Sequence, residues 1–189
     1  MQKIYKEMEC INLKTPRIET DRLLLREIQE TDVNDIFGCW MQDENVSRYM
    51  CWKASYDIAE TQSFVRFELE QIENEKWNRW IIVLRETGQI VGTCLVFFNE
   101  DDAENHWDIS YNLGKKYWGK GYITEAMKAV MQFAETKLGM EECITTYAKA
   151  NTASANVLHK LGFIDEAEIP YECSGGDIIT EGILCRYGL

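Results

Sequence analysis

Two different hydrophobic periods meet between residues 106 and 138, and this junction constrains the fold more than any other part of the chain. Residues 106–113 alternate polar and apolar side chains, as in a β-strand with one buried face; the apolar set is Trp107, Ile109, Tyr111 and Leu113. Residues 122–138 instead repeat apolar side chains every three or four positions, which is typical of an amphipathic helix, and Gly139 is suited to end it. Because another apolar strand follows at 143–148, the pattern predicts an α/β fold with a parallel connection between the two strands.

The rest of the chain predicts further helices and strands but no linker or repeat. Helices are expected at 31–41, with Thr31 as N-cap, and at 55–73 and 152–161; strands are expected at 17–28, 80–84 and 90–98 and, as a closing hairpin, at 163–173 and 178–186. A length of 189 residues favours one domain, since a domain takes roughly 150 residues. We expect that domain to span residues 17–189, after an arm over residues 1–16 where periodicity is weak.

Charge restricts the class of partner. The chain holds 32 acidic and 20 basic side chains, which give a net charge of −12 at pH 7. Such a chain is repelled by phosphate backbones, so nucleic acid is not expected as a partner. The same charge favours cationic small molecules or basic peptide ends.

Cysteine and histidine positions argue against a metal centre. The seven cysteines form no CxxC pair and neither of the two histidines adjoins a cysteine, so no metal is expected. Most cysteines lie in apolar surroundings and are predicted to be buried, reduced thiols. The first residues lack the apolar core of a signal peptide, and no run approaches the roughly 18 apolar residues of a membrane span. We therefore expect a cytoplasmic protein without membrane contact.

The loop between the strand at 106–113 and the helix at 122–138 combines three glycines with three lysines. Glycine lets the main chain approach a ligand closely, and the first amides of a helix are unpaired donors at its positive end. These features predict a phosphate or diphosphate site, with a plain turn and solvated lysines as the alternative. A nucleotide P-loop fits less well: Gly114, Gly119 and Lys120 have its spacing, but Gly121 stands where a Ser or Thr must reach Mg²⁺.

Residues 116–126, KYWGKGYITEA, resemble the Arg/Gln-x-x-Gly-x-Gly/Ala loop of the GNAT superfamily of acetyl-CoA-dependent N-acetyltransferases, in the form used by its ribosomal-protein N-terminal acetyltransferase subfamily. Residues 18–26, IETDRLLLR, resemble the opening strand of that subfamily, and residues 151–154 with 160–163 resemble its second motif. Lys116 departs from the usual Arg or Gln, at a loop that binds mainly through backbone amides. The resemblance, which runs from about residue 17 to the C-terminus, implies a GNAT-like α/β (α+β) fold with a mixed, mostly antiparallel central sheet of about seven strands flanked by helices.

The resemblance also implies which residues bind acetyl-CoA. The loop and the start of the long helix are expected to hold the diphosphate, and the end of the strand at 106–113 is expected to hold the pantetheine arm. The expected cofactor-binding residues are Tyr111, Asn112, Leu113, Lys116, Tyr117, Trp118, Gly119, Lys120, Gly121, Tyr122, Ile123, Asn151 and Ser154.

Asp108 and Ser154 are the candidate catalytic residues. Asp108 lies on the polar face of its strand, where many GNAT enzymes carry a Glu, and is expected to take the amine proton through a water; an ordinary exposed carboxylate is the alternative. Leu158 stands where many members carry an acidic Tyr, and the subfamily is thought to use the Ser at position 154 to protonate the leaving thiolate. A Ser satisfied by its own helix backbone is the alternative. Asn151 is expected to cap that helix or to bond the cofactor.

Together these inferences predict direct acetyl transfer from acetyl-CoA to a primary amine, with no metal and no covalent intermediate. The expected acceptor is the N-terminal α-amine of a protein such as a ribosomal protein, because a weak base suits an amine of pKa about 8 better than a lysine of pKa about 10.4. Polyamines or other small cationic amines, a non-catalytic CoA-binding sensor and a P-loop phosphotransferase are the alternatives. The sequence names neither the acceptor nor the oligomeric state.

Overall fold

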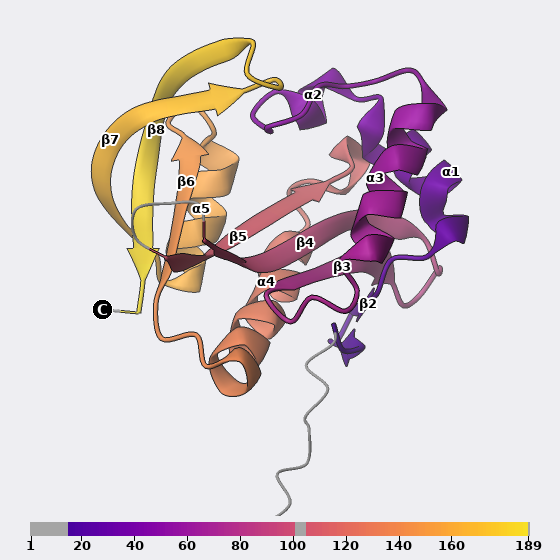
Figure 1. Ribbon diagram of the computed structural model, residues 1–189, viewed down its shortest axis with the longest axis horizontal. Helices are drawn as coiled ribbons and strands as arrows, with labels where there is room; N and C mark the ends of the chain where they lie inside the picture. The colour runs from indigo at the N-terminus through magenta and orange to yellow at the C-terminus, as the bar shows by residue number, and fades with distance from the viewer. Residues whose placement is uncertain (1–14, 101–104, 189) are drawn as a thin grey trace, which may run out of the picture.

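The structure, a computed structural model, describes residues 15–100 and 105–188 (Figure 1). Most of the predicted arm lies outside the described residues, as does Cys10. At its described end Thr15 is buried, and the carbonyl of Pro16 accepts a hydrogen bond from Trp80 Nε1 at 2.7 Å. The chain is therefore packed against the sheet before residue 17, where the arm was expected to end.

One sheet runs through the molecule in the order β1-β2-β3-β4-β5-β6-β8-β7 (Figure 1). Its strands are β1 Ile18–Glu19, β2 Leu23–Arg26, β3 Trp77–Leu84, β4 Ile90–Asn99, β5 His106–Leu113, β6 Cys143–Ala148, β7 Ile164–Cys173 and β8 Ile178–Tyr187. All neighbouring pairs are antiparallel except β5 and β6, which pair in parallel at Trp107 and Cys143. The mixed, mostly antiparallel sheet and its parallel connection are confirmed, and the short β1 makes eight strands where about seven were expected.

Helices cover both faces of this sheet. Short 3₁₀ turns span Glu30–Asp32 and Lys115–Tyr117, π-helical turns span Phe37–Met41 and Ala134–Leu138, and the α-helices are α1 Val33–Ile36, α2 Glu44–Ser47, α3 Ile58–Glu70, α4 Tyr122–Phe133 and α5 Thr152–Leu161. The helices predicted at 122–138 and 152–161 are confirmed, the first ending in a π-helical turn. Gly139 ends it with a φ of 70°, as its position in the sequence predicts.

The first helical segment begins before Thr31, so the predicted N-cap is wrong. The carboxylate of Asp32 accepts the backbone N–H of Gln29 at 2.8 Å, which places the start of the helical segment at residue 30. Arg26 of β2 donates two further hydrogen bonds of 2.8 Å to the same carboxylate. This buried ion pair, rather than the hydroxyl of Thr31, fixes the start of the helix.

The second helix is shorter than the predicted 55–73. Asp57 caps α3 by accepting the N–H of Ala59 at 2.9 Å, so the helix begins at Ile58. It ends at Glu70, where the backbone N–H of the next residue bonds back to the last turn.

Two apolar clusters lie on opposite faces of the sheet. One packs α4 and α5 against the strands and includes Ile109 and Leu113 of β5. The other packs α1 and α3 against β3 and β4. Because side chains alternate along a strand, Asp108, Ser110 and Asn112 face the second side. β5 therefore presents different side chains to the two halves of the molecule.

The β7–β8 hairpin, residues 164–187, bends across the second face and reaches the segment that follows α2 (Figure 1). Tyr171 Oη donates a hydrogen bond to the carbonyl of Tyr49 at 2.8 Å. At the hairpin tip, Asp177 forms an ion pair with Lys53. We call this hairpin, bridged to the α2–α3 segment, the hairpin arch.

Candidate active site

The edge of β5 that faces β6 offers main-chain groups to a ligand. Pairing with β6 stops near the start of the strand, where Thr145 Oγ1 donates to the carbonyl of Ile109 at 3.3 Å. At the other end Trp118 Nε1 donates to the carbonyl of Leu113 at 2.8 Å. Since alternate residues of a strand direct their main-chain groups to the same edge, Tyr111 presents its N–H and C=O there as well. This edge suits an extended ligand that pairs with the main chain.

The loop after β5 turns directly into the N-terminus of α4. Gly119 and Gly121 have φ angles of 72° and 78°, in the left-handed region that favours glycine. The first amides of α4 precede its first helical hydrogen bond and so remain available as donors. The ammonium groups of Lys116 and Lys120 lie 4.9 and 5.5 Å from the ring centre of Tyr117. Tight glycine turns, helix-end amides and two cations thus lie together, which is the arrangement that a diphosphate requires.

Thr20 and Arg22, which the sequence analysis did not place at the site, tie this loop to the turn between β1 and β2. Both residues donate hydrogen bonds to the carboxylate of Glu125 in the first turn of α4. Their signal was present in the sequence, because residues 18–26 carry part of the family resemblance. What the sequence did not show is that these residues contact a segment about one hundred positions away.

Asp108 is half-buried and accepts a hydrogen bond from the N–H of Ile109, so it is not an ordinary exposed strand carboxylate. Burial raises its pKa from 3.8 to about 6, although hydrogen bonds from Thr145 and from the N–H of Ile109, at 2.6 Å, oppose the increase. Burial raises the pKa of Tyr171 in the hairpin arch, and the negative charge of Asp108 makes a smaller contribution in the same direction. Tyr171 likewise contributes to the raised pKa of Tyr111, so the arch lies within electrostatic range of both side chains of β5.

Ser154 is bonded to β5 through its side chain. Its Oγ lies 2.9 Å from Tyr111 Oη, so the alternative of a hydroxyl satisfied only by its own helix does not hold. The carbonyl oxygen of the Asn151 side chain accepts the N–H of Ser154 at 3.2 Å, which confirms Asn151 as the cap of α5. Leu158 is fully buried one turn later and belongs to the apolar core.

Asp108 and Tyr111 act from opposite faces of β5. Three residues of strand separate them by about 10 Å along the chain. Ser154, held by Tyr111, lies on the side of α4 and α5, whereas the alternation of side chains along β5 directs Asp108 to the opposite side. A reaction that uses both groups must take place at the edge between β5 and β6.

One buried polar atom of β5 lacks a partner. Asn112 Nδ2 is buried, and it has no hydrogen-bond partner among the described residues. A buried N–H donor without a partner costs folding free energy, of the order of 1–3 kcal/mol. An acceptor atom on a bound ligand would remove that cost.

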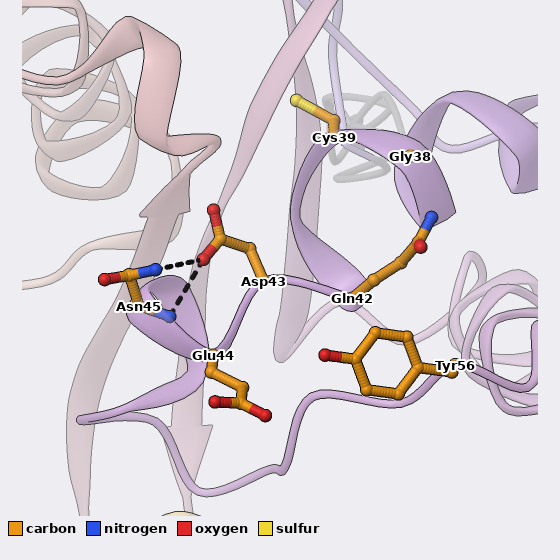
Figure 2. Close-up of a pocket in the computed structure, with 7 residues that line it drawn as sticks. All are labelled: Gly38, Cys39, Gln42, Asp43, Glu44, Asn45 and Tyr56. Atoms are coloured by element: carbon orange, nitrogen blue, oxygen red, sulfur yellow. Dashed lines mark hydrogen bonds between the residues drawn. The ribbon is translucent and has the colours of Figure 1, made fainter.

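A hollow of about 350 Å³ opens beside the start of the loop (Figure 2). Its lining residues are Gly38, Cys39, Gln42, Asp43, Glu44, Asn45 and Tyr56. Cys39 adjoins the loop, because a Cβ added at Gly114 would lie 2.5 Å from its Sγ. The carboxylate of Asp43 accepts two hydrogen bonds from Asn45, which lower its pKa. The two acidic side chains give the hollow a negative character.

The described part of the chain holds no group of three or more His, Cys, Asp or Glu side chains arranged to bind a metal ion. In residues 15–100 and 105–188 we also find no helix whose length and hydropathy would let it cross a bilayer. Most of the described cysteines are buried, as predicted; Cys51 is exposed and Cys39 is half-buried.

Comparison with known proteins agrees with this geometry. Residues 22–164 match the family profile described as "Acetyltransferase (GNAT) domain". The Uncharacterized N-acetyltransferase p20 of Bacillus licheniformis is 30% identical over 162 residues, which cover 85% of this chain and 89% of that protein.

Solved structures share the fold. The ribosomal-protein-S5-alanine acetyltransferase from Vibrio fischeri superposes with a TM-score of 0.76 at 19% identity, over 91% of this chain and 96% of that one. The microcin C7 self-immunity acetyltransferase MccE, in complex with acetyl-CoA and AMP, superposes with a TM-score of 0.79 at 18% identity, over 95% and 99% of the two chains.

Proposed function

Because the chain belongs to the acetyltransferase (GNAT) family, we propose that it acetylates the N-terminal α-amine of a protein, such as a ribosomal protein. The chain is an acetyl-CoA-dependent acyltransferase; the acceptor and the role of each residue form the proposal. One observation carries it: β5 holds a half-buried carboxylate, Asp108, on one face and, on the other, the hydroxyl of Tyr111, which is hydrogen-bonded to Ser154 of α5.

The residues around the loop fit acetyl-CoA, which when bound supplies an acetyl group in thioester linkage. The amides of residues 119–123 and the cations of Lys116 and Lys120 bind the diphosphate. The main chain of Tyr111 pairs with the pantetheine arm along the open edge of β5. Asn112 Nδ2 adds a donor without a partner of its own.

Asp108 acts as the base, through a water. With a pKa of about 6 its carboxylate is mostly ionised at pH 7 and accepts a proton weakly. An α-amine has a pKa of about 8, so the base falls about two pKa units short, whereas for a lysine amine it falls short by more than four. This difference favours an α-amine as the acceptor. The negative charge of the whole chain favours an acceptor with a basic segment behind that amine.

Ser154 donates a hydrogen bond to the sulfur that leaves, and Tyr111 positions it. Burial raises the pKa of Tyr111, so its hydroxyl stays protonated and is able to donate to Ser154 Oγ. When Tyr111 donates, the hydrogen of Ser154 must point to another acceptor. A hydroxyl that receives one hydrogen bond also donates a stronger one, so the pair stabilises a developing thiolate better than Ser154 alone.

The release of free thiol from acetyl-CoA, followed at steady state with matched acceptors, tests this proposal. One acceptor is a lysine-free peptide with a free N-terminus; its control carries a blocked N-terminus and one lysine. We expect release with the first peptide and little with the second. Release with the blocked peptide alone contradicts the proposal, and tight coenzyme A binding without release for any amine indicates a sensor.

A small cationic amine is the second candidate acceptor, because the acidic hollow adjoins the loop. Spermidine, supplied in place of the peptide, tests this candidate. If the hollow binds the amine, Asp43→Asn and Glu44→Gln should raise the KM for spermidine and leave the KM for acetyl-CoA unchanged. If both variants have the same KM for spermidine as the wild type, the hollow is excluded as the binding site of the amine.

A further inference from the structure

We propose that Arg22 is a positioning residue that sets the main chain of the diphosphate loop and neutralises the carboxylate beside it. The inference rests on acetyl-CoA binding at that loop. Arg22 lies in the turn just before β2, far from the loop in sequence, and two different nitrogens of its guanidinium contact the loop and the first turn of α4. Nη1 donates to the carbonyl of Lys120 at 3.0 Å, and Nε donates to Glu125 Oε2 at 2.6 Å.

The first contact orients a peptide plane. The C=O of Lys120 and the N–H of Gly121 belong to one planar trans peptide and point in opposite directions. Because Arg22 holds the carbonyl on its own side, the N–H of Gly121 is directed to the opposite side of the loop. We propose that this N–H joins the helix-end amides there, so that the contact adds one aligned donor to the diphosphate site. The positive φ of Gly121 permits this arrangement.

The second contact removes a repulsion. Glu125 lies in the first turn of α4, where a carboxylate interacts favourably with the helix dipole but repels a bound anion. Both of its oxygens are occupied: Oε1 accepts Thr20 Oγ1 at 2.6 Å and the N–H of Arg22 at 2.9 Å, and Oε2 accepts Arg22 Nε. Burial raises the pKa of Glu125, but these hydrogen bonds outweigh it and hold the pKa below the usual value. The carboxylate thus stays ionised, and Arg22 compensates its charge.

Stability alone does not explain these contacts. The guanidinium side chain is 49% exposed, and an exposed ion pair contributes little to folding, about 0–1 kcal/mol. The guanidinium also lies 4.6 Å from the ring centre of Tyr122, the first residue of α4. All the contacts converge on the helix end and the last peptide of the loop, which is where the diphosphate sits.

Binding measurements with two ligands separate positioning from general loosening. Coenzyme A contains the diphosphate; pantetheine ends before it. In Arg22→Gln we expect the Kd for coenzyme A, from titration calorimetry, to rise about tenfold, the size of one charge-assisted hydrogen bond. The Kd for pantetheine should stay within about twofold, because its contacts lie along β5. Arg22→Lys keeps the positive charge but not the forked guanidinium, so its Kd for coenzyme A should lie between those of the wild type and Arg22→Gln.

Arg17→Gln is the matched control, because Arg17 lies just before β1 and pairs with Glu19 at 2.8 Å. It should leave both Kd values unchanged. The double variant Arg22→Gln with Glu125→Gln should recover part of the loss, since the uncompensated carboxylate is gone. Equal weakening of coenzyme A and pantetheine, or no weakening at all, overturns the role of Arg22 while leaving the enzyme's function intact. A wild-type protein that fails to bind coenzyme A overturns the proposed function, and this inference with it.

Discussion

The two halves of the site are built in different ways. The cofactor side is formed by one continuous stretch, from the end of β5 through the loop into α4, with Arg22 and Thr20 as its supports from elsewhere. The proposed acceptor side is assembled from separate segments: Asp108 on β5, the hairpin arch and the segment after α2. Tyr171 and Tyr49, which bridge the arch, are 122 positions apart.

Because the two halves are built differently, we expect them to differ in how freely their ligand specificity can change. A local loop of glycines and helix amides has one geometry, which suits an anionic group such as the diphosphate that we propose for it. A surface assembled from distant segments changes whenever one segment changes, so it can vary between relatives without disturbing the cofactor side. We therefore expect variants on one side to alter acetyl-CoA binding and variants on the other to alter the acceptor kinetics, with little overlap.

Asp108→Asn is expected to have the largest effect, and on the acceptor side alone. Loss of a general base lowers kcat/KM for the amine by about a hundredfold at pH 7. The wild-type rate should rise with pH through about 6, as Asp108 ionises. At pH 9 most of an α-amine is already neutral, so the two enzymes should differ by less than about tenfold. The pH profile of kcat/KM between pH 5 and 9 checks this.

Stability provides the control for this variant. The pKa of Asp108 is raised in the folded state, so the native protein binds its proton more tightly than the unfolded chain does, and folding free energy is lost as pH rises from about 4 to 6. Asn carries no charge and avoids this loss, so the Tm of Asp108→Asn at pH 7 should be no lower than that of the wild type. A rate ratio that does not change with pH would remove Asp108 as the base, whereas a lower Tm would contradict the raised pKa.

Gly121→Ala tests the cofactor side. Alanine at a φ of 78° adds about 1–2 kcal/mol of backbone strain. We expect the loop to relieve this strain by moving the peptide between residues 120 and 121. We expect the Kd for coenzyme A to rise about tenfold and the KM for the amine to stay unchanged. Gly139→Ala is the matched control, with a φ of 70° at the far end of the same helical segment. It should lower the Tm similarly but leave coenzyme A binding intact; weaker binding in both variants would mean that strain is transmitted along α4.

The sequence predicts those parts of the fold and site that depend on local patterns, but not those that depend on contacts between distant residues. The limits of β5, β6 and α5 agree with prediction because their hydrophobic periods are local. The loop and its glycines were found for the same reason. Thr31 failed as a cap because Arg26, on another element, holds Asp32 at the helix start. The hairpin arch and the support from Arg22 depend on partners more than one hundred residues away, and no local pattern encodes such contacts.

The Tyr111 and Ser154 pair lies between the two halves, and variants of the pair should alter kcat rather than the binding of either substrate. Ser154→Ala and Tyr111→Phe should each lower kcat about five- to tenfold, the size of one hydrogen bond to a developing charge. If Tyr111 acts through Ser154, the double variant should be no slower than Ser154→Ala alone. The KM for both substrates should stay nearly constant. Independent, multiplying effects would show that Tyr111 has a role of its own.

The smallest expected effect comes from the hairpin arch. Tyr171→Phe removes the hydrogen bond to the Tyr49 carbonyl, about 1 kcal/mol, and leaves the ring in place. Since the arch lies near Asp108 and away from the loop, the KM for the amine should rise about threefold while the Kd for coenzyme A stays constant. Phe98→Leu, outside the arch on β4, provides a comparison that should leave the amine KM unchanged. A change in coenzyme A binding in Tyr171→Phe would mean that the two halves are mechanically coupled through β5, because that strand is the element they share.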